Sequence, residues 1–251
     1  MHLLDRPLLL FIVAFIVLWI AARVGALFRT RVPLPDDARS DFAIVLGAIL
    51  TLVGLIIGFT FSMATTRYDL RKSLEEQEAN AIGTEYLRVD LLPPQDAAQL
   101  KAALRSYTQL RIAFYEAAHG PELDRINAET EQAQERLWAL VAAAARQQPT
   151  PLAVFASAGM NDVINAQGYT QAAWWNRIPR SAWLLLFLIA ILGNLLLGYG
   201  AKGKWTVLSI VLPLAIGISF FLIADIDSPR AGIIHVHAVN IGALNGSLKG
   251  P

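Results

Sequence analysis

One stretch of the chain carries small and weakly polar residues at helical spacing inside an otherwise apolar run. Residues 42–65 contain no charged side chain. Within them Thr51, Gly54, Gly58, Phe61 and Thr65 recur at steps of three and four. On a helix this spacing places all five side chains on one face. We call this set the small-residue stripe.

Two interpretations of the small-residue stripe stay open. Gly54 and Gly58 form a GxxxG pattern, which lets two helix backbones approach closely in a membrane. Alternatively, identical helices from several subunits present the stripe to a central pore, where Phe61 forms an apolar constriction that gates by dewetting. One helix can serve both roles.

Charged residues follow the stripe directly and continue the same predicted helix. Arg71 and Glu75, and likewise Lys72 and Glu76, lie four residues apart, which favours a solvated helix face with ion pairs. If several copies surround an axis, rings of charge at the pore mouth would bias the choice of ion. The residues considered for such rings include Arg67, Asp69, Lys72 and Glu76.

Residues after the last apolar run are weak candidates for a metal site. Asp225 and Asp227 supply too few oxygens for calcium, so we expect capping or an ion pair with Arg230. His235 and His237 would point the same way only on a strand, and no third ligand is nearby. We therefore predict no metal site and a solvated tail.

Enzyme and transporter patterns are missing from the sequence. It contains no HExxH, P-loop lysine, GxSxG or strand-linked GxGxxG motif. The predicted membrane spans carry no central Asp, Glu, Lys, Arg or His, so a proton-coupled relay lacks its usual groups. We predict no catalytic residue and no cofactor.

Composition indicates the solvent that surrounds these residues. The chain is 55% hydrophobic and only 16% charged. Its apolar residues form long runs rather than a helix or strand period. A net charge of +1, with both signs intermixed, argues against a nucleic-acid partner. The sequence has no cysteine, which excludes disulfides and thiolate sites. The lipid bilayer is the predicted partner.

Four apolar runs have the roughly 20 residues that a membrane-crossing helix needs. They are Pro7–Leu27, Phe42–Thr65, Ala182–Tyr199 and Trp205–Ala224. The first could instead be a cleaved signal peptide, but it is longer than usual for one and lacks a basic leader. Four spans place both termini and the middle of the chain on one side. A slight excess of Lys and Arg there predicts that this side is cytoplasmic.

A water-facing helical domain is predicted between the second and third spans. No proline interrupts residues 36–92, so the second helix can continue to Arg88. An antiparallel hairpin follows, with a capping box at Asp96 and Gln99 and a break at Gly120. Thr150 caps a last helix. The predicted parts are 1–66 and 179–226 in the membrane, 67–178 in water, and 227–251 as a tail.

Motifs spread over nearly the whole chain resemble those of bacterial bestrophin-like membrane proteins. They are GFTFSMA at 58–64, RYD at 67–69, EANAIGT at 78–84, YLR at 86–88, LLP at 91–93, NRIP at 176–179 and DIDSPR at 225–230. The resemblance implies a pentameric anion channel with its pore on the symmetry axis. It adds Asn80, Thr84 and Glu85 as pore-mouth candidates. The acidic calcium clasp of bestrophins has no counterpart in the sequence.

The sequence as a whole predicts an all-α integral membrane protein of the bacterial inner membrane. We expect a homo-oligomeric, pentameric channel for small inorganic ions, lined by the second span. The alternative is a membrane scaffold or sensor whose helical domain binds a partner, with the small-residue stripe packing subunits together.

Overall fold

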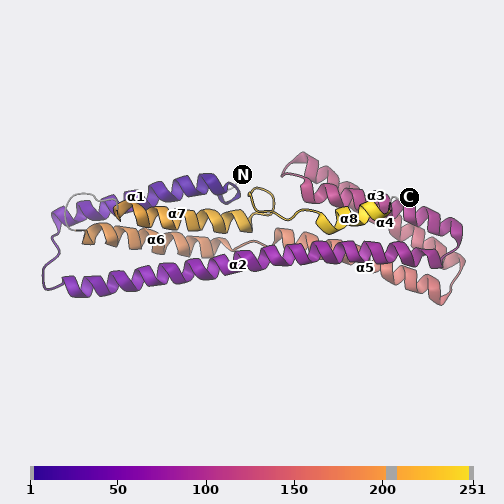
Figure 1. Ribbon diagram of the computed structural model, residues 1–251, viewed down its shortest axis with the longest axis horizontal. Helices are drawn as coiled ribbons and strands as arrows, with labels where there is room; N and C mark the ends of the chain where they lie inside the picture. The colour runs from indigo at the N-terminus through magenta and orange to yellow at the C-terminus, as the bar shows by residue number, and fades with distance from the viewer. Residues whose placement is uncertain (1–2, 202–207, 249–251) are drawn as a thin grey trace. The chain divides into compact units, whose positions relative to one another are not determined.

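The computed structural model describes residues 3–201 and 208–248, and every regular element in these ranges is helical (Figure 1). The α-helices are α1 Pro7–Arg31, α2 Arg39–Arg88, α3 Pro94–Glu116, α4 Pro121–Gln147, α5 Pro151–Trp175, α6 Arg180–Gly200, α7 Leu208–Asp227 and α8 Val239–Leu248. Short 3₁₀ turns occupy Leu3–Asp5 and Val89–Leu91. The predicted all-α class is confirmed.

Four helices are long and apolar enough to cross a membrane, as the sequence predicts. They are α1, α2, α6 and α7. The predicted start of the fourth span, Trp205, lies outside the described residues. Pro213 lies inside α7, and the helix continues past it to Asp227. The chain is thus a multi-pass membrane protein.

The chain folds as two compact units. The membrane unit comprises Met1–Arg67 and Arg177–His235, and the helical unit comprises Tyr68–Asn176 and Val236–Pro251. Helix α2 contributes to both units. At 1.5 Å per residue its 50 residues span about 75 Å, well beyond a bilayer core of about 30 Å. The continuous helix expected from the lack of proline is confirmed.

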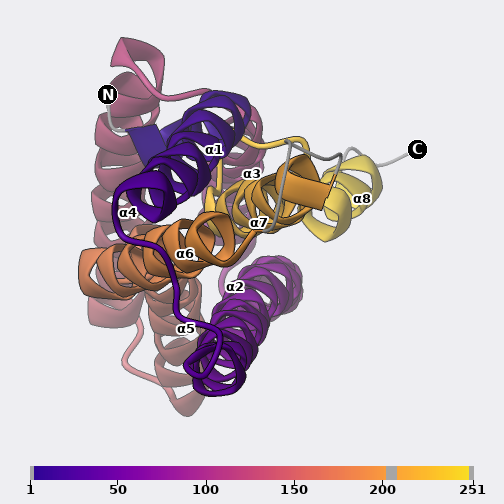
Figure 2. The same cartoon turned by 90° about the vertical axis from the view of Figure 1, so that its left-hand side faces the viewer.

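Glycines set the packing of the membrane unit. Helix α1 packs against α6 and α7, which lie beside it in Figure 2. A Cβ added at Gly25 of α1 would overlap the backbone of Leu195, and one added at Gly198 of α6 would overlap the backbone of Ala22. Close backbone approach through small residues is typical of helix association in lipid.

The two ends of the membrane unit are fixed by polar contacts. At one end Arg177, which precedes α6, pairs with Asp5 before α1 and with Asp227 at the end of α7. At the other end Nη1 of Arg29 donates to the carbonyl of Gly200, 2.8 Å away, at the end of α6. Helices α1 and α6 therefore run parallel. One crossing, that of α2, lies between them in the chain, as the order of the four spans requires.

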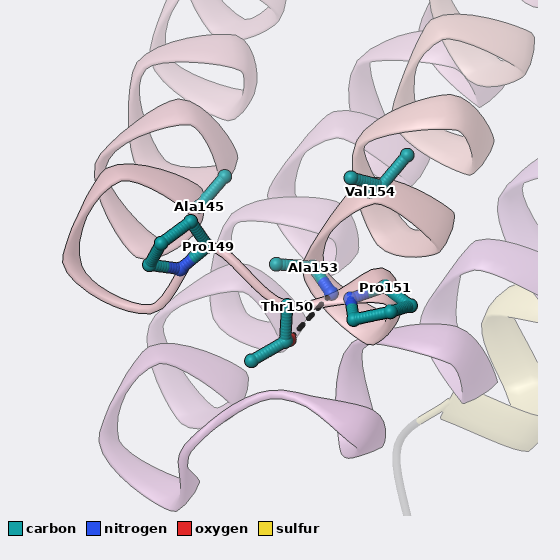
Figure 3. Close-up of a pocket in the computed structure, with 6 residues that line it drawn as sticks. All are labelled: Ala145, Pro149, Thr150, Pro151, Ala153 and Val154. Atoms are coloured by element: carbon teal, nitrogen blue, oxygen red, sulfur yellow. Dashed lines mark hydrogen bonds between the residues drawn. The ribbon is translucent and has the colours of Figure 1, made fainter.

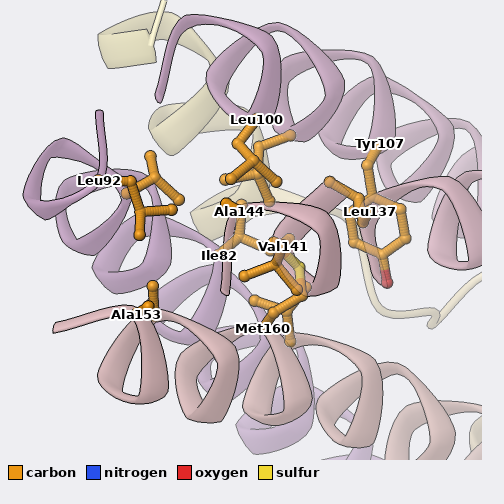
Figure 4. Close-up of a cluster of buried hydrophobic side chains, with 13 residues drawn as sticks. Ile82, Leu92, Leu100, Tyr107, Leu137, Val141, Ala144, Ala153 and Met160 are labelled. Atoms are coloured by element: carbon orange, nitrogen blue, oxygen red, sulfur yellow. The ribbon is translucent and has the colours of Figure 1, made fainter. Parts of the chain in front are cut away.

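The helical unit encloses a core built from α2, α3, α4 and α5 (Figure 4). Its fully or nearly fully buried members include Ile82, Leu100, Leu104, Tyr107, Leu137, Val141 and Met160. Helices α3 and α4, which form the predicted hairpin, both supply residues to this core. Burial of each such side chain stabilises the fold by about 1.5–3 kcal/mol.

Local signals that end or start helices are confirmed in part. The Thr150 hydroxyl accepts a hydrogen bond from the Ala153 N–H at 3.2 Å, as predicted for an N-cap. The capping box at Asp96 and Gln99 is wrong. Helix α3 begins two residues earlier at Pro94, because a proline at the first helical position needs no side-chain cap for its missing N–H.

The C-terminal segment is not the predicted solvated tail. Residues Val239–Leu248 form α8, and Ile241 is fully buried against the helical unit. Ile241, Leu244 and Leu248 recur at steps of three and four, but the helix has only ten residues and contains two glycines, so the sequence alone gives a weak signal for it.

A glycine-to-alanine change tests the helix crossing in the membrane unit. Gly25→Ala should lower the thermal unfolding temperature, because overpacking costs about 1–3 kcal/mol and the neighbouring atoms are backbone. Circular dichroism of the full chain in detergent measures the effect. Gly246→Ala, where no atom lies within 4 Å, is the control and should leave the temperature unchanged or higher. Equal effects at the two positions would contradict the crossing.

Candidate pore helix and its buried carboxylates

The membrane-crossing part of α2 is the least covered of the four spans. Only 6% of its most apolar window is buried inside the chain, against 33–50% for the other spans. One face does pack on α6, where Gly193 lies near Leu50 and Val53, and the Phe42 and Tyr199 rings are 5.7 Å apart. The rest of the helix surface faces outward.

The small-residue stripe lies on this uncovered surface. Thr51, Gly54, Gly58 and Phe61 are exposed, and Thr65 is half-buried. A Cβ added at Gly54 or Gly58 would meet nothing within 4 Å. The GxxxG pattern therefore packs against no helix within the described part of the chain. Glycine inside a helix costs about 1 kcal/mol relative to alanine, and no contact from residues 3–201 or 208–248 offsets that cost.

The uncovered surface of α2 has a second and different side. Leu52, Leu55, Phe59 and Met63 are exposed there, 39–64% accessible, and all four are large and apolar. At 100° per residue, this side and the stripe lie on opposite flanks of the packed face, each roughly 120° away from Val53. Bulky apolar side chains suit lipid, whereas small and hydroxyl-bearing ones suit a close neighbour or water.

Four of the predicted pore-mouth residues continue the stripe beyond the apolar run. Asp69, Lys72, Glu76 and Asn80 are all exposed on the same flank of α2. Arg67 instead lies toward the packed face and is half-buried. Its Nε and Nη1 atoms are buried with no hydrogen-bond partner among the described residues. The structure thus groups four of these five residues and sets Arg67 apart.

The predicted solvated face is wrong for Glu75, and Glu85, a pore-mouth candidate by resemblance, is buried rather than exposed. Glu75, Glu78 and Glu85 are each at most 1% exposed. Their spacing of three and seven residues follows the packed face of the helix. The sequence carries this signal as a period shared with Ile82 and Val89, but charge obscures it because buried carboxylates are rare.

Glu78 is the centre of a buried polar network. Its carboxylate pairs with Arg111 of α3, and accepts hydrogen bonds from the hydroxyls of Tyr115 and Thr170, both at 3.1 Å. The Arg111 guanidinium also lies 4.3 Å from the centre of the Phe114 ring. Four buried groups from α2, α3 and α5 thus bond to one another, while Nη1 of Arg111 has no hydrogen-bond partner among the described residues.

The electrostatics of this network favour the charged form of Arg111. Burial tends to lower the pKa of Arg111, but the Glu78 carboxylate, together with Tyr107 and Tyr115, outweighs burial, so that the pKa lies above its ordinary value. Burial, followed by the negative charge of Glu78, raises the pKa of Tyr115. The phenol therefore stays a hydrogen-bond donor throughout the physiological range.

Glu75 and Arg71 join the ends of two other helices to α2. The Glu75 carboxylate accepts hydrogen bonds from the N–H groups of Asn240 and Ile241 at 2.8 and 2.9 Å, at the start of α8. A carboxylate at a helix N-terminus is favoured by the unsatisfied N–H groups and the helix dipole. Arg71 donates to the carbonyls of Ala173 and Asn176, both at 3.2 Å, at the end of α5.

Asp225 and Asp227 have structural partners. The Asp225 carboxylate accepts hydrogen bonds from the N–H groups of Ile233 and Ile234 at 2.8 and 2.9 Å, so it holds the irregular segment after α7 rather than capping a helix. Asp227 accepts from the Ile178 N–H at 3.1 Å and pairs with Arg177. Across the described residues no cluster of three His, Cys, Asp or Glu side chains could hold a metal ion.

A hollow at the turn between α4 and α5 offers no chemistry (Figure 3). Its volume is about 540 Å³, and it is lined by Ala145, Pro149, Thr150, Pro151, Ala153 and Val154. Thr150 supplies the polar side chain of this lining, and it already accepts the Ala153 N–H. The surface of α2 is therefore the stronger candidate for function.

Comparison with known proteins agrees with this architecture. The Bestrophin-like domain family matches residues 8–241. The crystal structure of a bacterial Bestrophin homolog from Klebsiella pneumoniae is 13% identical at a TM-score of 0.64, over 95% of each chain. A variant of that homolog is 12% identical at a TM-score of 0.64, over 95% of this chain and 94% of that one. The crystal structure of a membrane protein variant is 12% identical at a TM-score of 0.66, over 95% of this chain and 96% of that one. No curated protein matches.

Breaking the buried ion pair between Glu78 and Arg111 tests how much it contributes to the stability of the helical unit. Glu78→Gln should lower the free energy of unfolding by about 3–5 kcal/mol, because Arg111 is left buried without a counter-charge. Thermal unfolding of the full chain in detergent measures it.

The control for this change is Arg125→Gln, which removes an exposed pair with Glu122 and Glu129 and should cost at most about 1 kcal/mol. Combining Glu78→Leu with Arg111→Met should cost less than Glu78→Gln alone. A Glu78→Gln protein as stable as the parent would rule out the network as a structural anchor.

Proposed function

The chain belongs to the Bestrophin-like domain family, and from that premise we propose that it is a homo-oligomeric ion channel lined by α2. The small-residue stripe faces the conducting path, and the helical unit forms a vestibule on the cytoplasmic side of the bacterial inner membrane. By resemblance to bestrophins the oligomer is a pentamer and the ion a small inorganic anion.

The observation that supports the proposal is the uncovered stripe of α2. Four helices of one chain leave Thr51, Gly54, Gly58 and Phe61 without a covering element. A single copy cannot enclose a water path with a helix that has only one packed face. Several copies around an axis cover the stripe and give its hydroxyl groups water to contact.

The two exposed phenylalanines of α2 have different roles in this arrangement. Phe61 lies on the small-residue stripe and is 41% exposed, whereas Phe59 lies on the bulky apolar side and is 64% exposed. A ring of Phe61 side chains forms a narrow apolar constriction, which excludes water when it narrows. Phe59 faces lipid or a neighbouring copy.

The vestibule carries both signs of charge. Each copy presents Asp69 and Glu76 as anions and Lys72 as a cation on the flank that continues the stripe. In a ring these charges set the local potential at the pore mouth and alter the local concentration of ions. Asn80 adds an uncharged polar ring one turn further on.

A second function, a scaffold that docks a partner, has an observation in its favour. The helical unit exposes large apolar side chains, including Leu87 at 70% and Val154 at 67%. Isolated exposed apolar residues are normal on soluble surfaces, so this observation carries less weight than the uncovered stripe.

Ion flux through two matched variants tests the channel. Purified protein in liposomes should pass chloride or a small cation, and Phe61→Ala should change the flux several-fold because it widens the constriction. Phe59→Ala removes the same ring from the other side of α2 and should leave the flux within a factor of about two.

The oligomeric mass in detergent is measured first by light scattering. A multiple of the monomer mass is expected, since one copy leaves the stripe open. A monomer would contradict the channel. An oligomer in vesicles that remain tight to every ion tried would contradict the channel and favour the scaffold.

A further inference from the structure

Glu85 differs from the other buried glutamates of α2 because no helix end and no cation is hydrogen-bonded to it among the described residues. Glu75 is bonded by N–H groups of α8, and Glu78 by Arg111 and two hydroxyls. Glu85 is 0% exposed, and neither of its carboxyl oxygens has a hydrogen-bond partner in the described part of the chain. An ionised carboxylate in this position would pay a large desolvation cost.

The backbone of α5 leaves space for the Glu85 carboxyl at one glycine. A Cβ added at Gly159 would overlap Oε2 of Glu85 and the guanidinium of Arg88. Gly159 is buried, and its missing side chain leaves the space that the carboxyl occupies. The site is therefore formed by two helices, with the acid on α2 and the glycine on α5.

The nearest cation is engaged elsewhere. Arg88 follows Glu85 by one helical turn, and its Nη1 lies 3.4 Å from the Asp162 carboxylate of α5. The same guanidinium lies 4.5 Å from the centre of the Phe155 ring, also on α5. Arg88 thus links α2 to α5 while it borders the space beside Gly159, within reach of Glu85.

The electrostatic balance favours a neutral acid. Burial raises the pKa of Glu85 to about 8, Arg88 on the same helix opposes this rise, and Asp162 on α5 adds to it. At neutral pH the carboxyl therefore holds its proton, and it ionises in mildly alkaline solution.

We propose that Glu85 and Gly159 form a proton-binding site, and that loss of the proton draws Arg88 away from Asp162 and Phe155 to the Glu85 carboxylate. In the protonated state Arg88 fastens α5 to α2. In the ionised state Arg88 pairs within α2, and the fastening is lost. Because α2 is also the pore helix of the proposed function, this site makes conduction respond to pH.

Infrared spectroscopy of the full chain in lipid tests the proton site without relying on conduction. The carbonyl band of a protonated carboxylic acid should be present at pH 7 and decrease as the pH rises, with its midpoint near pH 8. Glu85→Gln should remove this titrating band. Glu76→Gln, an exposed glutamate of the same helix, is the control and should leave it in place.

Two further variants keep the test independent of folding defects in Glu85→Gln. Asp162→Asn removes the charge that disfavours ionisation, so the band should titrate at lower pH. Gly159→Ala pushes the carboxyl out of its space toward water and should also lower the midpoint. Hydrogen exchange in the first turns of α5, corrected for intrinsic rates, should be faster at pH 9.5 than at pH 7 in the parent and equal in Glu85→Gln.

The raised pKa of Glu85 also makes the stability of the protein depend on pH. The pKa of Glu85 is higher in the folded chain than in the unfolded one, so the folded state holds a proton that unfolding releases. The unfolding temperature of the parent relative to Glu85→Gln should therefore fall as pH rises from about 4.5 to about 8, and level off above.

Failure of the proton site and failure of the channel give different results. A band that is absent at pH 7, or that persists in Glu85→Gln, overturns the proton site whatever the flux. Exchange in α5 that does not change with pH in the parent overturns the Arg88 movement. A normal band titration in vesicles that pass no ion at any pH overturns the proposed function and leaves the proton site standing.

Discussion

Hydrocarbon offers backbone groups no water, so each apolar run that crosses it has to bond its own N–H and C=O groups as a helix. This constraint determines α1, α2, α6 and α7. The hydrophobic effect does not draw these helices together in lipid, and close contact has to do so. Gly25 and Gly198 supply that contact between α1 and α6. Helix α2 has no comparable contact along its small-residue stripe, and its surface there is left for another molecule.

The same helix is governed by a different solvent past Arg67. In water, burial of apolar side chains does stabilise the fold, and α2 becomes one wall of the core of the helical unit. Its packed face carries Glu75, Glu78 and Glu85 into that core. Each glutamate therefore needs a partner, a helix end or a proton. Glu75 thereby contacts α8, Glu78 contacts α3, and Glu85 contacts α5. All three helices are thus attached to α2, the helix that we propose lines the pore.

The sequence predicted those features that depend on a single chain segment. The lengths of the apolar runs predicted the four spans. The lack of proline predicted that α2 is continuous, and Thr150 before Pro151 predicted the N-cap of α5. The burial of Glu75, Glu78 and Glu85 was missed, because the residues that contact their carboxyl groups from other helices lie 33 or more residues away along the chain. Helix α8 was missed for the same reason, since a carboxylate 165 residues earlier caps it.

The most direct test asks which side of α2 contacts water. The natural chain has no cysteine, so single cysteines can be placed at Thr51, Gly54, Gly58 and Thr65 on the stripe, and at Leu52, Leu55 and Met63 on the bulky side. A charged, membrane-impermeant thiol reagent is then applied to the protein in lipid vesicles. The account predicts modification at stripe positions and none at the bulky ones. Equal protection on both sides, or modification of the bulky side alone, would contradict it.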